Sequence, residues 1–352
     1  MRPSPARLRA AIAGLLLLTL TLSLLAGCGR TPSAGPAPNP PTPPTVTAPP
    51  PDTRPKSPIS GLPYDAANVG PVVAVMVENH RDARPQSGLL DADLVYEALA
   101  EGGISRFMAI YYGTRPKVVG PVRSARPYYV LLAHEWDAIY AHCGGDPKDL
   151  DPIHQWGVAD ADEINNAGEA FWRTTDRKAP HNLYTSIDKL LQHAKRAYPQ
   201  RTFAPEPATR WSFVPGTDKA PVQQVDIAYD RNYTVAYKFE AGVYHRYMNG
   251  KLHSDKESGQ PLVVTNILIQ FVPTRVAYPD GGLKMDLVGK GKAEYVIGGR
   301  FVQGTWAKDD VASATRFLDD QGQSISLTAG QTWIQIVPTG AGVVVQQAAA
   351  GN

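Results

Sequence analysis

Prolines are spread unevenly along this chain, and their distribution decides which part of it can fold. Residues 29–58 hold 12 of the 32 prolines, with Thr, Ser, Ala and Gly between them and no apolar period. A segment of this composition cannot bury enough apolar surface to fold. Pro-rich chains favour extended polyproline II at about 3.1 Å per residue, so we expect a disordered tether of up to ~90 Å.

The residues before the tether have the three parts of a secretory signal. A start that holds three arginines is followed by an apolar run over 10–25, and Leu-Ala-Gly precedes Cys28. This order is typical of a signal peptide, and the run is short for a membrane-spanning helix. Leu-Ala-Gly-Cys resembles the lipobox of bacterial lipoproteins, in which the cysteine is lipidated. We therefore predict lipidation at Cys28 and a lipid-anchored protein on the extracytoplasmic face of the cell membrane.

Charge and cysteine content exclude several classes of protein. The chain has 35 Lys and Arg against 33 Asp and Glu, and removal of the signal peptide leaves 32 against 33. No basic excess remains for a nucleic-acid partner. Two cysteines are too few for a disulfide scaffold or a Cys-based zinc cluster. The predicted partners are the membrane and either cell-wall glycan or an envelope protein, and no cofactor is expected.

The first half of the folded part alternates strand and helix patterns. A β-branched run over 72–77 predicts a buried strand, and two apolar runs on either side of Gly102-Gly103 favour a hairpin, although a helix over the first run is an alternative. Pro127 suits the first turn of a helix, and a strand over 138–141 follows. The clearest amphipathic helix covers 188–198. These patterns predict an α/β domain with a mixed sheet.

The second half has the two-residue period of strands from Val225 onward. Asn249-Gly250 is a strong hairpin signal, and Gly298-Gly299 marks a second hairpin. The only helical window covers 311–317, so this half reads as mostly antiparallel β. The predicted class is α+β, with these segments: 1–27 signal peptide, 28–58 lipidated cysteine and tether, 59–205 N-terminal domain, 206–220 linker, 221–340 C-terminal domain, 341–352 disordered tail.

Several strings in the folded part resemble one bacterial family. They are Arg84–Gly88, Tyr96–Gly103, Gly120–Tyr128, Phe171–Arg173, Ala179–Tyr184, Gly304–Trp306 and Gln331–Trp333. Together they are similar to the YerB-type lipoproteins, a family with an N-terminal domain of unknown function and a C-terminal partner domain. The resemblance covers nearly everything after residue 59. It implies a location and a two-domain architecture, but no assigned reaction. The family carries a small residue where this chain has Cys143, which argues against a catalytic thiol.

The first half concentrates polar residues beside Gly, Pro and Ser, where loops carry function. The candidate catalytic residues are Glu97, Glu101, His142 and His181. Glu97 and Glu101 have the residue type of a general acid, as glycan cleavage requires. The two histidines suit acid–base catalysis, and the alternative is that both are structural residues whose ring nitrogens are satisfied by hydrogen bonds. Because no H-x-x-x-H or H-E-x-x-H spacing occurs, we predict no metal.

The candidate ligand-binding residues share the same segments. They are Arg123, Arg126, Asp146, Arg173 and His181. Arginine presents a planar donor fork that suits a carboxylate or phosphate. Arg123 and Arg126 would face one ligand if they lay on one helical turn, and the alternative is that they form salt bridges with Glu97, Glu101 or Asp146.

The preferred hypothesis is a lipid-anchored protein that binds a cell-envelope ligand, a glycan or a peptide. The first alternative is a peptidoglycan-cleaving enzyme with Glu97 or Glu101 as general acid. The second is a scaffold for another envelope protein. No Walker motif, no G-x-S-x-G and no G-x-G-x-x-G after a strand occurs in the chain, which excludes the nucleotide-binding and serine-hydrolase interpretations. Whether the protein is an enzyme stays open at this point.

Overall fold

The computed structural model describes residues 52–204, 210–216 and 222–348. The predicted signal peptide, Cys28 and most of the tether lie outside the described residues. Ordered structure begins earlier than the predicted boundary at residue 59, because Ser57 is buried and Lys56 forms a bridge with Pro63.

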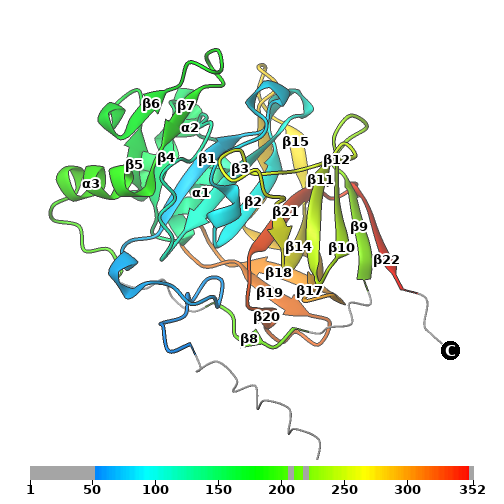
Figure 1. Ribbon diagram of the computed structural model, residues 1–352. Helices are drawn as coiled ribbons and strands as arrows, with labels where there is room; N and C mark the ends of the chain where they lie inside the picture. Colours follow the sequence, from blue (N-terminus) through cyan, green and yellow to red (C-terminus); the bar gives the residue numbers. More distant parts are fainter. Residues whose placement is uncertain (1–51, 205–209, 217–221, 349–352) are drawn as a thin grey trace, which may run out of the picture. The chain divides into compact units, whose positions relative to one another are not determined.

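A ten-stranded mixed sheet runs through both halves of the chain (Figure 1). Its two central neighbours, β2 and β21, come from different halves and pair in parallel. The described residues thus belong to one compact unit. The strands, in sheet order, are β19 (Arg316–Asp319), β18 (Arg300–Lys308), β17 (Gly289–Ile297), β14 (Asn266–Val272), β21 (Thr332–Pro338), β2 (Leu94–Leu99), β3 (Ser105–Tyr111), β1 (Val73–Glu78), β4 (Ile139–His142) and β5 (Ala159–Asp162).

A second, antiparallel sheet is built from the C-terminal half. Its strands are β12 (Lys251–Leu252), β11 (Val243–Met248), β10 (Thr234–Glu240), β9 (Val222–Ala228) and β22 (Gly342–Gln347), with β13 (Val263–Val264) paired to β11. Three short pairs complete the strands: β6 (Phe171–Arg173) with β7 (Leu183–Thr185), β15 (Thr274–Val276) with β16 (Leu283–Met285), and β8 (Phe213–Val214) with β20 (Leu327–Thr328).

The described residues of the N-terminal half form three α-helices: α1 (Pro127–Glu135), α2 (Pro147–Trp156) and α3 (Ile187–Ala197). Pro127 occupies the first turn of α1, as predicted, and Ser186 caps α3 by accepting a hydrogen bond from the Lys189 N–H. Helices confined to one half and a mostly antiparallel other half make the fold α+β, which confirms the predicted class.

Both predicted hairpins of the C-terminal half form. Asn249 and Gly250 have φ values of 46° and 75° between β11 and β12, as a two-residue primed turn requires. Gly298 and Gly299 likewise join β17 to β18 with positive φ. The N-terminal hairpin around Gly102 also forms, between β2 and β3.

Three local predictions differ from the structure. Residues 311–317 are not helical, because the Asp310 carboxylate accepts the N–H groups of Ala312 and Ser313 and forms a turn instead. The predicted linker 206–220 contains β8, which pairs with β20. The predicted disordered tail 341–352 contains β22, because Val343 and Val345 pack on the core while the strand pairs with β9.

Candidate functional site

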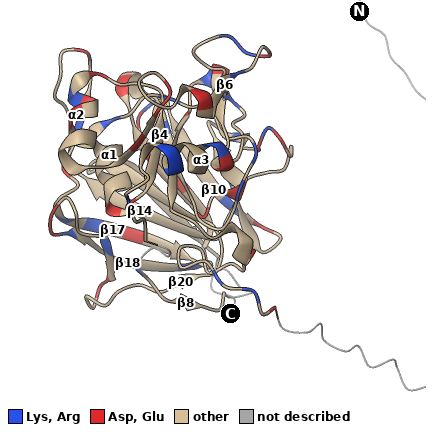
Figure 2. Ribbon diagram, turned by 90° about the vertical axis from the view of Figure 1, so that its left-hand side faces the viewer, with Lys and Arg blue, Asp and Glu red and all other residues tan. Residues whose placement is uncertain are grey.

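Polar residues gather where three neighbouring strands end. Strands β1, β4 and β5 are parallel, so their carboxyl ends lie at one edge of the sheet (Figure 1). Glu78 ends β1, and His142 and Asp162 end β4 and β5. In sheets with parallel strands and helical crossovers, ligands bind outside such carboxyl ends. Charged residues of both signs lie close together around the loops near β6 and α2 (Figure 2).

Glu78 is the centre of this edge. Its side chain is 6% exposed, and it lies between two partners from different loops. Nε of Arg123 is 3.1 Å from its Oε1, and Nδ1 of His181 is 2.9 Å from its Oε2. If Nδ1–H of His181 donates to the carboxylate, Nε2 keeps its lone pair and can accept a hydrogen bond.

Arg123 is held by its backbone and leaves half of its guanidinium free. Its N–H donates to the Met76 carbonyl, and its carbonyl accepts the Cys143 N–H, so the residue is fixed beside the ends of β1 and β4. Its side chain is 29% exposed. Nε forms an ion pair with Glu78 but no hydrogen bond, and within the described residues Nη1 and Nη2 make no hydrogen bond either. These two nitrogens form a planar donor fork that faces solvent.

The edge continues from Arg123 through a closed series of polar contacts. The Cys143 thiol donates to Glu163 at 3.2 Å. Arg173 donates to Glu163 and to Asn182, each at 3.3 Å, and Asn182 is the chain neighbour of His181. We call this set the polar rim: Glu78, Arg123, Cys143, Glu163, Arg173, His181 and Asn182.

Cys143 is an unreactive member of the polar rim. Burial raises the pKa of its thiol to about 11, and the hydrogen bond and charge of Glu163 act in the same direction. Since the thiolate is the nucleophile, the thiol has no catalytic character at neutral pH. This outcome agrees with the expectation drawn from the family pattern.

His142 is a structural residue. Its side chain is fully buried; Nε2 lies 2.8 Å from Oδ1 of Asp160, and Nδ1 lies 3.0 Å from the Gly144 carbonyl. Both ring nitrogens are therefore occupied, as in the alternative that the sequence left open. His142 lies at the edge, but neither of its ring nitrogens is available to a ligand.

Arg126 and Glu101 form a separate ion pair. Nε and Nη2 of Arg126 lie 2.6 Å and 2.7 Å from the two oxygens of Glu101, and Nη1 is 3.2 Å from Asp149. Burial acts to raise the pKa of Glu101, but the hydrogen bonds and charge of Arg126 outweigh it and lower that pKa. Arg123 and Arg126 precede α1 and so do not lie on one helical turn, and they have different carboxylate partners. Arg126 forms a salt bridge with Glu101, as in the alternative that the sequence left open.

Asp146 caps the start of α2 and does not belong to the polar rim. Its N–H donates to the Asp149 carboxylate, and its own carboxylate pairs with Lys148 at 2.7 Å. The structure therefore brings Arg123, Arg173 and His181 together and leaves Arg126 and Asp146 in other contacts.

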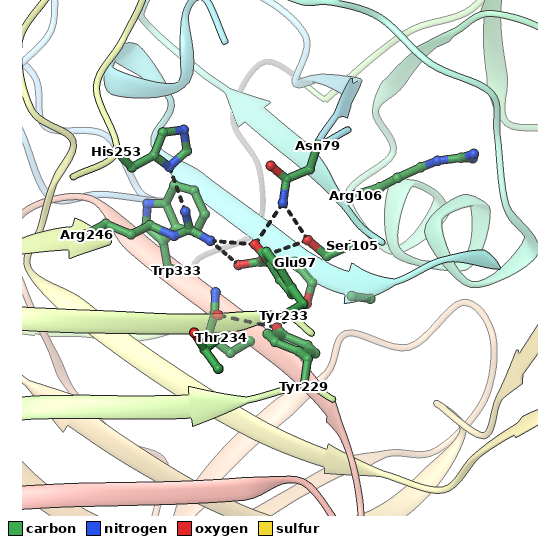
Figure 3. A network of polar contacts seen from close by, with 12 residues as sticks. Asn79, Glu97, Ser105, Arg106, Tyr229, Tyr233, Thr234, Arg246, His253 and Trp333 are labelled. Atoms are coloured by element: carbon green, nitrogen blue, oxygen red, sulfur yellow. Dashed lines mark hydrogen bonds and ion pairs between the residues drawn. The ribbon is translucent and has the colours of Figure 1, made fainter. Parts of the chain in front are cut away.

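Glu97 lies inside the molecule (Figure 3). Its side chain is fully buried and accepts hydrogen bonds from Arg246 at 2.6 Å, Tyr233 at 2.5 Å and Ser105 at 2.7 Å. A carboxylate in this position cannot contact a substrate. Glu97 and Glu101 therefore do not act together. Glu97 pairs with Arg246 inside the molecule, and the partly buried Glu101 pairs with Arg126.

The network around Glu97 reaches the polar rim through residues that the sequence analysis missed. Nη1 of Arg246 lies 2.6 Å from Nδ1 of His253, whose Nε2 is 2.8 Å from the Gln86 side chain. Gln86 in turn donates to the Glu78 carbonyl at 2.9 Å. Arg246 takes an inward position in the alternating strand β11, between Tyr244 and Met248. A charged residue at an inward position of a strand indicates a buried ion pair, and this was the signal in the sequence that could have identified Arg246.

The segment Arg84–Gly88, which carries part of the family resemblance, is held by hydrogen bonds to a loop of the C-terminal half. Asp255 accepts the Gly88 N–H at 2.6 Å, and Glu257 accepts the Ser87 hydroxyl at 2.8 Å. Lys256 pairs with Asp176 of the loop that leads to His181, at 2.6 Å. The C-terminal half thus fixes two loops that flank the polar rim.

One group of three potential metal ligands occurs in the described residues: His80, Asp82 and His181. The two imidazole rings are stacked, with centroids 4.7 Å apart and planes within 9°. Because the ring lone pairs lie in these parallel planes, they do not converge on one ion. The residues present do not fit a metal in this arrangement.

In the part of the chain that the structure covers, no helix has the length and apolarity that a membrane crossing needs.

Two family profiles match the sequence. The N-terminal domain of a protein of unknown function, DUF3048, matches residues 59–200, and its C-terminal domain matches residues 225–334.

Two further comparisons agree with these matches. "Putative lipoprotein YerB" of Bacillus subtilis is 34% identical over 292 residues, which cover 80% of this chain and 86% of that protein. The crystal structure of the YerB protein from Bacillus subtilis has a TM-score of 0.74 at 33% identity, and the match covers 83% of this chain and all of that one. The chain belongs to the DUF3048 family, which confirms the resemblance found in its sequence.

Proposed function

We propose that this protein is held on the extracytoplasmic face of the cell membrane by a lipidated Cys28 and binds a cell-envelope ligand, a glycan or a peptide, at the polar rim. The observation that carries the binding proposal is the free donor fork of Arg123. A half-buried guanidinium with two unpaired nitrogens is suited to a carboxylate, because the fork and the carboxylate match in geometry.

The neighbours of Arg123 extend this binding surface. With Nδ1–H of His181 donated to Glu78, its Nε2 is an acceptor for a hydroxyl or amide. Arg173 is 42% exposed and donates two long hydrogen bonds, to Glu163 and Asn182. Peptide carboxylates and sugar hydroxyls both supply groups that such a surface binds. The carboxylates Glu78 and Glu163 hold these donors in place.

The anchoring proposal has two supports. The lipobox-like sequence ends at Cys28, and the similar protein from Bacillus subtilis is named a lipoprotein. The Pro-rich composition of the residues after Cys28 is that of a spacer, which would separate the anchor from the folded part.

The glycan-cleaving alternative lacks such support. A general acid must be protonated at the working pH and must contact the substrate. Glu97 is fully buried, and the pKa of Glu101 is lowered by Arg126. Both observations count against an acid catalyst at these positions.

Sedimentation with insoluble cell-wall sacculi tests the binding proposal. The full chain, purified in detergent, is mixed with sacculi and the bound fraction is measured. We expect Arg123→Ala to weaken retention about tenfold or more, since a charge-assisted hydrogen bond contributes about 1.5–3 kcal/mol. Arg300→Ala is the matched control, because Arg300 is an exposed arginine separated from β1 by five strands of the sheet. Equal retention of wild type and Arg123→Ala, or no retention of either, would overturn the proposal.

A further inference from the structure

We propose a second binding site, independent of the polar rim, that takes a small organic carboxylate with a short apolar group. It is a cavity of about 270 Å³ where the turn between β11 and β12 meets the segment at Arg84. Its polar lining includes Arg84, Lys251 and His253, and its apolar lining includes Pro85, Met248 and Leu252.

Arg84 is a half-buried cation with no carboxylate partner among the described residues. All its side-chain hydrogen bonds go to Asn79: Nε donates to Oδ1 at 3.0 Å and to the carbonyl at 3.2 Å, and Nη2 donates to the carbonyl at 2.8 Å. Burial lowers the pKa of the Arg84 guanidinium, and the charge of Arg246 acts in the same direction. An arginine nevertheless stays charged at neutral pH, so the positive charge persists.

The surroundings do not neutralise this charge. Glu97 lies close enough to act on Arg84, but it forms its ion pair with Arg246 at 2.6 Å. His253 is neutral, because burial lowers its pKa well below the ordinary value and the charges of Arg246 and Arg84 add to the effect. One positive charge is left over at the wall of the cavity. Burial of such a charge is costly unless an anion pairs with it.

Lys251 adds a second cation on the solvent side. It is exposed and has no ion pair within the described part of the chain. A ligand in the cavity would therefore meet a planar fork from Arg84 and a point charge from Lys251. The fork matches a carboxylate, which can accept two parallel hydrogen bonds.

The apolar lining of the cavity determines which chemical group the ligand carries besides its carboxylate. Met248 is almost fully buried, whereas Leu252 is 45% exposed and is one of the few large apolar side chains on the surface. A small aliphatic group between these residues and Pro85 would cover Leu252. The cavity volume suits a molecule the size of one acylated amino acid.

Calorimetric titration of the full chain in detergent tests the site. The probe is N-acetyl-leucine, and its uncharged amide is the control for the carboxylate. We expect the acid to bind and the amide not to bind. Lys251→Ala should weaken binding three- to tenfold and Arg84→Lys more than tenfold, while Lys284→Ala, an exposed lysine on β16, should leave it unchanged.

The proposal would be overturned by no binding of N-acetyl-leucine at up to about 50 mM, by equal binding of the acid and the amide, or by tighter binding of inorganic phosphate than of the acid. Lys251 is exposed, and its side chain forms no hydrogen bond or ion pair within the described part of the chain, so Lys251→Ala decides the question even if Arg84→Lys does not fold. Unchanged binding in Lys251→Ala would also contradict the site.

Discussion

Nη2 of Arg246 lies 2.6 Å from Oε2 of Glu97, and both side chains are completely buried. Arg246 belongs to β11 of the antiparallel sheet and Glu97 to β2 of the ten-stranded sheet, so this ion pair joins the two sequence domains of the family (Figure 3). The guanidinium also lies 4.4 Å from the centre of the Trp333 ring. Buried ion pairs of this kind are costly to form and more costly to break.

Removal of one partner of this pair should be strongly destabilising. We expect Glu97→Gln to lower the free energy of unfolding by about 3–5 kcal/mol, because it leaves the Arg246 charge buried without a counter-charge. The double variant Glu97→Leu/Arg246→Met should lose less than Glu97→Gln does. Urea unfolding of the full chain measures both effects, and a Glu97→Gln variant as stable as wild type would contradict this account.

The Asp93 carboxyl should make stability depend on pH. It is 4% exposed and accepts hydrogen bonds from Ser57, Ser60 and the Tyr112 N–H, which fasten the first ordered segment to the sheet. Burial raises its pKa from 3.8 to about 6, and these hydrogen bonds only partly oppose the shift. The folded state therefore binds the proton more tightly than the unfolded state does.

The sign follows from this difference in proton binding. The stabilising contribution of Asp93 is present below pH 4 and is lost as the pH rises through about 6. A shift of this size corresponds to roughly 3 kcal/mol. Urea unfolding between pH 4 and 7 should show a steeper decline for wild type than for Asp93→Asn. Parallel curves for the two proteins would show that Asp93 does not titrate in this way.

The full chain should release no muropeptides from purified peptidoglycan between pH 4 and 8. The reason is that the two candidate acids are a buried ion-pair partner and a carboxylate with a lowered pKa. Chromatography of the supernatant after incubation measures the release. Release that Glu101→Gln abolishes, but Arg123→Ala does not, would restore the enzymatic alternative.

Cys143 should react slowly with alkylating reagents. With a thiol pKa of about 11, its thiolate fraction at pH 8 is about 100-fold lower than that of an ordinary cysteine. Mass spectrometry of the peptide that contains residue 143 gives the rate of modification by iodoacetamide. Glu163→Gln should speed the reaction, because Glu163 contributes to the raised pKa. A rate equal to that of free cysteine would contradict the geometry.

Local patterns predicted most of the fold. The run at β1, the glycines between β2 and β3, Pro127 at α1 and Asn249-Gly250 all act within a few residues, so the sequence shows them directly. The pairing of β2 with β21 was not visible, because it joins residues more than 200 positions apart. No local pattern records which strand becomes the neighbour of another.

Only part of the candidate site could be predicted, because its remaining contacts join residues that are far apart in the sequence. Arg123 and His181 could be predicted because each lies beside turn-forming residues. Glu78, to which both bind, could not, because it ends a strand whose other residues are apolar core. Glu97 lies in the apolar run before Gly102-Gly103, and this run alone does not show that its side chain is buried. Its burial depends on Arg246, which comes from the other half of the chain.

The most direct test of the central claim is nuclear magnetic resonance of arginine side chains during addition of soluble muropeptides. With nitrogen-15 in the arginines of the full chain, the Nε–H signal of Arg123 can be assigned by its loss in Arg123→Lys. The account predicts that this signal shifts in a saturable manner, while that of Arg300 stays fixed. An Arg123 signal that does not move at saturating muropeptide would contradict ligand binding at the polar rim.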